Sequence, residues 1–508
     1  MGGESPDPAF AMPLIGPAES SPYRGGRSGF GGSPAARTPG GVASSGEVSA
    51  LLGAPVGPKL ARTLGMTDVY CMIVCVLVNS VFISPVIVQQ GSLLSALVIL
   101  GIAGAITLAC VVVYTELAAF LPSAGGDYEY IRVAFGSRPA FAYAWTMLVF
   151  LQSCTTALEA LAFSSLMYCD MMPSLRHHDG ECTTSEGVAI HDYRVKGIAI
   201  VAVLAATAFN CLDVRRVAGA QRLFALMKFA VVALVFGACV RYAWGAPDRL
   251  RASLRFDWSV FRFQNLHHVI TALLWSVDGF NSIVCLSEEM RHPKVQMGRA
   301  LFYGVITILA MYALLVVSYF CVLDPAIVVQ RGKGVAMQAM AVAAGERWGA
   351  AISVLVALSA LATINGYIMT GGRWLYAAAR NGHFPRVLTS LGARSRAPYA
   401  AVIVQGVWPA ACLAFQGPSF DDLLSFFGIN AWLFYFVVAM AFLKFQATVD
   451  NQTWTRRRTA SLAAAGVVLV CCAIMLLLSV YNSPFITLLS FTFLLSSIPA
   501  QHMLSHAD

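Results

Sequence analysis

Charged side chains are scarce in this chain of 508 residues, because Lys, Arg, Asp and Glu together make up only 12% of it. Soluble domains carry about 25% charged residues. Hydrophobic residues make up 58% of the chain, and its mean hydropathy is +0.69. Such a chain lacks the polar surface that a soluble fold of this length needs. We therefore expect a membrane protein that faces lipid.

Spacings typical of metal sites and disulfide frameworks are also missing. The thirteen cysteines form no C-x-x-C pair, and the nine histidines form no H-E-x-x-H motif and no zinc spacing. Most of the cysteines lie in or beside apolar runs, where a thiol behaves as a small hydrophobe. Only Cys169 and Cys182 flank a polar loop. We expect no catalytic residues, no metal and no cofactor.

The net charge of +8 does not indicate a nucleic-acid partner, because the basic residues cluster in short loops between apolar runs. Residues 1–62 are rich in Gly, Pro, Ser and Ala and show no hydrophobic period. We expect them to form a disordered cytosolic tail, followed by a transmembrane transporter domain over 63–502. The start of the chain does not have the pattern of a secretory signal.

Apolar runs recur from Thr67 onward, and a spanning helix needs about 20 such residues. The expected fold is an all-α polytopic membrane protein with twelve spans. They lie at about 67–89, 93–121, 139–168, 195–213, 219–243, 266–287, 299–324, 348–376, 399–416, 422–444, 460–480 and 484–501. With twelve spans, the basic loops all fall on one side, which predicts cytosolic N- and C-termini.

Two of the predicted spans carry polar residues in their middle. Span 67–89 contains Asn79 and Ser80, and span 266–287 contains Asp278, Gly279 and Asn281. Interrupted helices are tolerated where they line a cavity, and interruptions five spans apart point to a carrier built from inverted repeats.

The alternative is that these polar residues join neighbouring helices by hydrogen bonds. For Asn79, Ser80 and Asn281 both interpretations stay open. For Asp278 we favour a functional role, because an Asp at mid-bilayer costs about 3 kcal/mol.

Five stretches carry a resemblance to a known family: FISP at 82–85, YTELAAFLPSAGGDYEYI at 114–131, SEEMRHP at 287–293, YAAARNGHFP at 376–385 and AWLFYF at 431–436. In this order they resemble the amino acid–polyamine–organocation superfamily, closest to its L-type amino acid transporter branch. The resemblance implies a LeuT-like core of five plus five inverted helices, followed by two more. It also implies alternating access around a midplane site, and it assigns the acidic end of helix two, the GGDY loop and Glu289 to the family architecture rather than to the substrate.

The resemblance places a substrate site at the break of the first helix. Amino acid carriers of the family have Gly-Ser-Gly there, and its N–H groups bind the substrate carboxylate. Here the aligned residues are Val78, Asn79 and Ser80, close to Phe82. Because both glycines are absent, carboxylate binding is in doubt.

The sixth helix departs from the L-type pattern as well. Trp275 lies where those carriers have a gating Phe, and Asp278 lies where they have a small Gly. The stretch WSVDGFNS also resembles the polyamine-uptake permeases, in which an aromatic cage and acidic groups hold an ammonium. A cation over an aromatic ring gains about 2 kcal/mol when it is desolvated.

Two further ionisable residues lie inside predicted spans. Glu159 is either a substrate ligand, hydrogen-bonded by Thr155 or Thr156, or the internal partner of Lys228. In related carriers a lysine at the position of Lys228 takes the place of a sodium ion. It implies either a proton switch or a fixed structural cation, and it disfavours sodium dependence.

The leading hypothesis is a secondary active transporter of organic cations, either a diamine or polyamine such as putrescine or spermidine, or a cationic amino acid. The first alternative is a neutral L-type amino acid exchanger, in which Cys182 would link the chain to a glycoprotein partner. A nutrient sensor on a transporter fold is the second alternative. The expected location is the plasma membrane.

Overall fold

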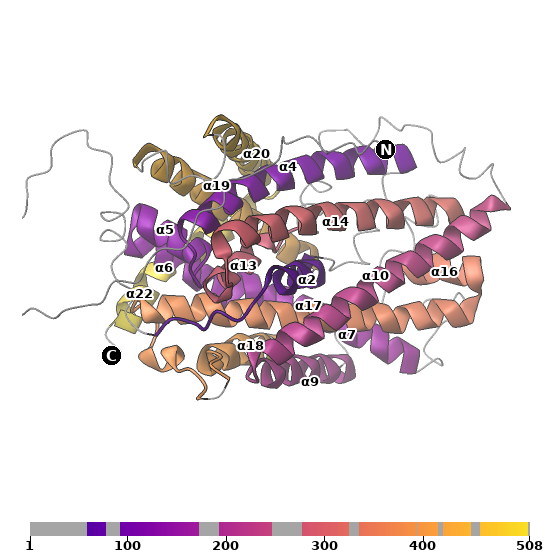
Figure 1. Ribbon diagram of the computed structural model, residues 1–508, viewed down its shortest axis with the longest axis horizontal. Helices are drawn as coiled ribbons and strands as arrows, with labels where there is room; N and C mark the ends of the chain where they lie inside the picture. The colour runs from indigo at the N-terminus through magenta and orange to yellow at the C-terminus, as the bar shows by residue number, and fades with distance from the viewer. Residues whose placement is uncertain are drawn as a thin grey trace, which may run out of the picture. The chain divides into compact units, whose positions relative to one another are not determined.

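The computed structural model describes residues 58–77, 92–171, 193–245, 277–324, 335–393, 395–414, 420–448 and 458–505 (Figure 1). Within these ranges the regular elements are helices, apart from one isolated bridge between Leu64 and Met290. The helices of the first half are α2 (Met66–Leu77), α4 (Leu93–Phe120), α5 (Asp127–Phe135), α6 (Ser137–Thr146), the π-helical turn η1 (Met147–Leu151), α7 (Gln152–Met171), α9 (Tyr193–Asn210) and α10 (Val214–Trp244).

The second half contains α13 (Phe280–Val284), the 3-10 turn η4 (Cys285–Glu289), α14 (Pro293–Val322), α16 (Val335–Ala344), α17 (Glu346–Arg380), the 3-10 turn η6 (Arg386–Thr389), α18 (Tyr399–Ala414), α19 (Phe420–Thr448), α20 (Arg458–Asn482), α21 (Pro484–Leu495) and α22 (Ser497–Ser505).

Nine helices in the described ranges are long and apolar enough to cross a membrane. They lie at Leu93–Phe120, Ser137–Tyr168, Tyr193–Asn210, Val214–Trp244, Pro293–Val322, Glu346–Arg380, Phe426–Thr448, Arg458–Asn482 and Pro484–Leu504. Each matches a predicted span, so the prediction of an all-α polytopic membrane protein is confirmed. The helices at the other three predicted spans are shorter where they are described, so the count of twelve stays a prediction.

One short helix, α16, was not predicted. It has only ten residues, about half the length that crosses a bilayer, so it does not stand out as a span in the sequence. The helix packs against α17 and α10. Gly345, with a φ of 101°, separates it from the start of α17.

The bundle is built from long helices that pack along one another. α14 lies beside α4, α17 beside α7, and α19 beside α20, and Figure 1 shows α14 and α4 running together. The second half of α17 is buried along its whole length, from Ala362 to Arg380. α20 and α21 instead expose apolar side chains such as Leu477 and Phe485, as expected of helices that face lipid.

Two buried ion pairs tie η4 to α17 at the end of the bundle that the loop charges predict to be cytosolic. Arg373 Nε lies 2.7 Å from Glu289 Oε1, and both nitrogens of the Arg380 fork donate to Glu288 at 3.0 Å. Glu288 also accepts hydrogen bonds from the backbone N–H groups of Leu60 and Ala124. The acidic pair of the SEEMRHP stretch therefore holds three separate parts of the chain together.

Candidate functional site

The backbone is non-helical from Val277 to Gly279, and α13 begins at Phe280. Gly279 has a φ of 106°, a conformation that favours glycine. A Cβ there would lie 3.0 Å from Val76 Cγ1 of α2. This non-helical segment lies against α2, because Gly279 has no Cβ to keep it away. The helix that the sequence predicts before it lies outside the described residues.

The last carbonyls of α2 are bound by side chains from three other helices. Cys75 O accepts hydrogen bonds from Lys228 Nζ at 2.7 Å and from Thr363 Oγ1 at 2.9 Å, and Leu77 O accepts one from Tyr312 at 2.7 Å. Both carbonyls lie at the end of the described part of α2. Each therefore finds a donor inside the bundle, where water is scarce.

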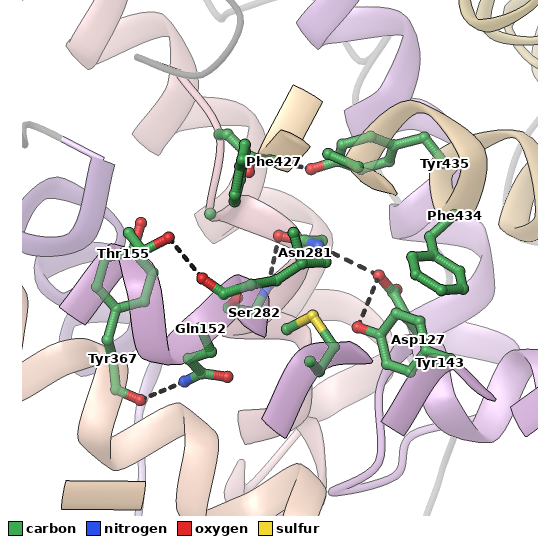
Figure 2. A pocket seen from close by; sticks show the side chains of 15 residues that line it. Asp127, Tyr143, Gln152, Thr155, Asn281, Ser282, Tyr367, Phe427, Phe434 and Tyr435 are labelled. Atoms are coloured by element: carbon green, nitrogen blue, oxygen red, sulfur yellow. Dashed lines mark hydrogen bonds between the residues drawn. The ribbon is translucent and has the colours of Figure 1, made fainter. Parts of the chain in front are cut away.

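A cavity lies between the 277–282 segment, the α6–η1–α7 span and α19 (Figure 2). Its walls come from α5, the α6–η1–α7 span, the 277–282 segment, α17 and α19. The lining residues are Asp127, Tyr143, Met147, Leu151, Gln152, Thr155, Asp278, Gly279, Asn281, Ser282, Tyr367, Phe427, Ala431, Phe434 and Tyr435.

Asp278 is partly exposed in the cavity wall, and its carboxylate accepts a hydrogen bond from the Tyr435 hydroxyl. The Tyr435 ring stacks on Phe280 with a centroid distance of 5.7 Å. Asp278 and Tyr435 also line a second, more apolar cavity with Cys110 and Trp432. The carboxylate therefore lies in the wall between two cavities, with an aromatic ring beside it.

A second carboxylate, that of Asp127, also lines the first cavity. Asp127 is the first residue of α5, and its side chain is buried. Its Oδ2 accepts hydrogen bonds from Tyr114 at 3.0 Å, Asn281 at 3.2 Å and Tyr143 at 3.4 Å. Its Oδ1 has no hydrogen-bond partner among the described residues. Burial raises the pKa of Asp127 to about 7.

The cavity floor includes a π-helical turn, Met147–Leu151, followed by Gln152. Such turns often occur at functional sites, because they displace the side chains that follow. Gln152 Nε2 donates to Tyr367 O, and Gln152 Oε1 accepts from the Trp374 indole, both at 2.5 Å. Gln152 therefore fixes this span to α17 (Figure 2).

Among its described lining residues the cavity has two carboxylates and no Lys, Arg or His side chain. No ion pair joins either carboxylate to another described residue. A buried carboxylate is costly unless a positive group neutralises it. The site can therefore supply negative charge and aromatic faces to a ligand.

Lys228 is buried on α10, outside this cavity. Besides Cys75 O, its ammonium contacts Thr363 Oγ1 of α17 at 3.3 Å. A cation at the C-terminal end of α2 also interacts favourably with the helix dipole. Lys228 therefore joins α2 and α17, and its role as a proton switch or a fixed cation stays a prediction.

Glu159 is buried on α7 and does not line the cavity. Thr155 and Thr156 donate their hydroxyls to Leu151 O and Gln152 O, so they are not the donors that the sequence suggested for this carboxylate. Glu159 lies close enough to Lys228 to interact with it electrostatically. Its surroundings therefore fit the internal partnership better than the ligand role.

The structure brings three of the predicted site residues together, namely Asp278, Gly279 and Asn281. Asn281 has both roles that the sequence left open, because it lines the cavity and also joins α13 to α5 through Asp127. The remaining candidates lie outside the described residues: Val78, Asn79, Ser80, Phe82, Trp275 and Cys182.

Sequence reasoning missed Asp127, Tyr435 and Gln152 as cavity residues. Asp127 belongs to the GGDY loop and Tyr435 to AWLFYF, and both stretches were interpreted only as family motifs. The polar Gln152 within an apolar run was the one local signal available.

Comparisons with known proteins show which proteins this chain is similar to. A family model described as amino acid permease matches residues 64–498. The b(0,+)-type amino acid transporter 1 of Oryctolagus cuniculus is 28% identical over 391 residues, which cover 75% of this chain and 75% of that protein. The cystine/glutamate transporter of Homo sapiens is 25% identical over 83% of this chain and 81% of its own. The large neutral amino acids transporter small subunit 2 of Homo sapiens is 26% identical, with coverages of 75% and 69%.

Proposed function

Because the chain belongs to the amino acid permease family, we propose that it is a secondary active transporter of small organic cations. Its substrate would be a diamine or polyamine such as putrescine or spermidine, or a cationic amino acid. Proteins of this family are transporters rather than enzymes, and the apolar helices make the chain a multi-pass membrane protein.

The observation that carries the proposal is the charge of the cavity. Asp278 and Asp127 line it without a described cationic neighbour, so a bound cation would supply the missing positive charge. The aromatic rings of Tyr435, Phe427 and Phe434 add faces on which a desolvated ammonium gains about 2 kcal/mol. A neutral substrate would leave both carboxylates uncompensated.

Transport would proceed by alternating access around this cavity. The non-helical segment at Asp278 would act as a hinge, and Val78, Asn79, Ser80, Phe82 and Trp275 would complete the site. We place the protein in the plasma membrane with both termini in the cytosol. Lys228, already bound to α2 and α17, would make transport independent of sodium.

Uptake of radiolabelled putrescine, spermidine, arginine and leucine in cells without endogenous polyamine transport tests this proposal. Saturable uptake of at least one of the three cations is expected, at the same rate when potassium replaces sodium. Cells that take up leucine but none of the cations would overturn it. Uptake by cells transfected with the empty vector is subtracted as the background.

A second candidate function is exchange of neutral amino acids, which the similarity to the large neutral amino acids transporter favours. That name also includes the words small subunit, which supports a partner chain, and Cys182 would be the linking cysteine. A non-reducing gel tests this candidate. A reducible complex that disappears in Cys182→Ser would favour the exchanger, together with leucine uptake.

A further inference from the structure

Asp127 has the properties of a ligand-binding carboxylate rather than only of a structural one. Its side chain is 3% exposed, and it lines the same cavity as Asp278. Three donors converge on Oδ2, whereas Oδ1 has no hydrogen-bond partner among the described residues. A buried carboxylate oxygen without a donor is costly, and a ligand N–H group can satisfy it.

Each of the two carboxylates is hydrogen-bonded by one member of a pair of contacting tyrosines. Tyr114 donates to Asp127 and Tyr435 donates to Asp278, and the two tyrosine rings meet edge to face at a centroid distance of 6.0 Å. Phe280 contacts both rings, at 5.4 and 5.7 Å. Both carboxylates line the same cavity, and Figure 2 shows Asp127 and Tyr435, which is hydrogen-bonded to Asp278, in its wall.

A molecule that neutralises both carboxylates has two cationic groups, and an aliphatic chain between them can contact the aromatic side chains of the cavity wall. We propose that Asp127 binds a second ammonium group, so that the cavity selects aliphatic α,ω-diamines over monoamines. This inference rests on the proposed function, since it assumes that Asp278 binds the first ammonium. It adds a residue of the GGDY loop to the substrate site and narrows the substrate class.

The two carboxylates come from different parts of the fold. Asp278 lies at the helix break before α13, and Asp127 begins α5. Asn281 of α13 donates a hydrogen bond to Asp127, so the segment that carries Asp278 contacts the Asp127 carboxylate directly. A substrate that bridges them would bind both α13 and α5, whereas a monoamine would contact only one of them.

The test compares half-saturation concentrations for uptake of n-butylamine with those of 1,3-diaminopropane, putrescine and cadaverine. In the wild type, the best diamine should saturate at a concentration about 10- to 100-fold lower than the monoamine, the effect expected of one charged hydrogen bond. Asp127→Asn retains the acceptor for Tyr114 but removes the charge, and it should reduce this ratio to less than about threefold.

The matched control is Glu129→Gln, which removes a negative charge from the same helix. Glu129 pairs with Arg132 at 2.7 Å and does not line the cavity, so the ratio should stay at its wild-type value. If Asp127→Asn weakens monoamine and diamine uptake by the same factor, or leaves the ratio unchanged, Asp127 is structural and the inference is wrong. If the wild type takes up no cation at all, the proposed function itself fails.

Asp127→Glu keeps the experiment decisive if the Asn variant does not reach the membrane. It retains the charge but extends the carboxylate by one methylene. The preferred diamine should then become shorter than in the wild type. An unchanged order of preference would contradict the inference.

Discussion

The Tyr435 hydroxyl donates a hydrogen bond to the Asp278 carboxylate and so joins α19 to the helix break in the cavity wall. The same ring stacks on Phe280, the first residue of α13. Tyr435 therefore orients the carboxylate without removing its charge. This arrangement leaves Asp278 available to a cationic ligand and fixes the direction from which that ligand is bound.

Tyr435→Phe should raise the KM for cations about tenfold with little change in the maximal rate. The variant retains the ring that stacks on Phe280 but loses the hydrogen bond to a charged group, an interaction of about 1.5–3 kcal/mol. Initial uptake rates over a range of substrate concentrations measure the effect. An equal loss of maximal rate and surface protein would instead indicate a folding defect.

Gly279→Ala should abolish uptake and lower the Tm of the purified protein. The φ of 106° costs an alanine about 1–3 kcal/mol, and the added Cβ would crowd Val76 at 3.0 Å. Gly136→Ala is the matched control, since Gly136 has a φ of 95° but nothing within 4 Å of the added atom. The control should lower the Tm but retain uptake. Loss of uptake in both variants would contradict a specific role for the break.

Diamine uptake should strengthen as the cytosolic pH rises through about 7. Burial raises the pKa of Asp127 to about 7, so its charged form is lost as the pH falls through that value. An ammonium needs the charged form, hence affinity is present above the pKa and declines below it. The groups that face Asp127 are Tyr114, Tyr143, Asn281, Tyr130, Cys285 and, across the cavity, Asp278.

Inside-out vesicles at several pH values measure this dependence for putrescine and for n-butylamine. The ratio of their half-saturation concentrations should change with pH in the wild type and be constant in Asp127→Asn. A ratio that is independent of pH in the wild type would exclude titration of Asp127 in this range.

The buried ion pair between Glu288 and Arg380 should stabilise the folded protein, and removing either partner should cost more than the second removal adds. Breaking a buried pair costs about 3–5 kcal/mol because one charge stays uncompensated. Glu288→Gln and Arg380→Gln should each lower the Tm, and the double variant should lower it by less than their sum. The more exposed pair Glu129–Arg132 is the control, with an expected effect of at most about 1 kcal/mol. Additive losses at Glu288 and Arg380 would contradict the coupling.

The spans could be predicted because hydrophobicity over about 20 residues is a local property of the chain. α16 was missed because its ten residues are too few to indicate a span, and its burial depends on contact with α17, α10 and α14.

The site was predictable only where a charge interrupts an apolar run, as at Asp278. Asp127 lies in a short acidic loop, where a carboxylate does not stand out from its neighbours. Its place on the cavity wall depends on how α5 packs beside α13. Tyr435 gave no signal either, because an aromatic residue in an apolar helix is usually part of the core. Tertiary packing, which the sequence does not display, decides both cases.

The most direct test of the account is the uptake kinetics of putrescine in cells expressing wild-type protein, Asp278→Asn or Asp278→Glu at equal surface amounts. If Asp278 binds the ammonium, Asp278→Asn should raise the half-saturation concentration at least about tenfold, and Asp278→Glu should restore part of the affinity. Saturable putrescine uptake with unchanged kinetics in Asp278→Asn would contradict the account.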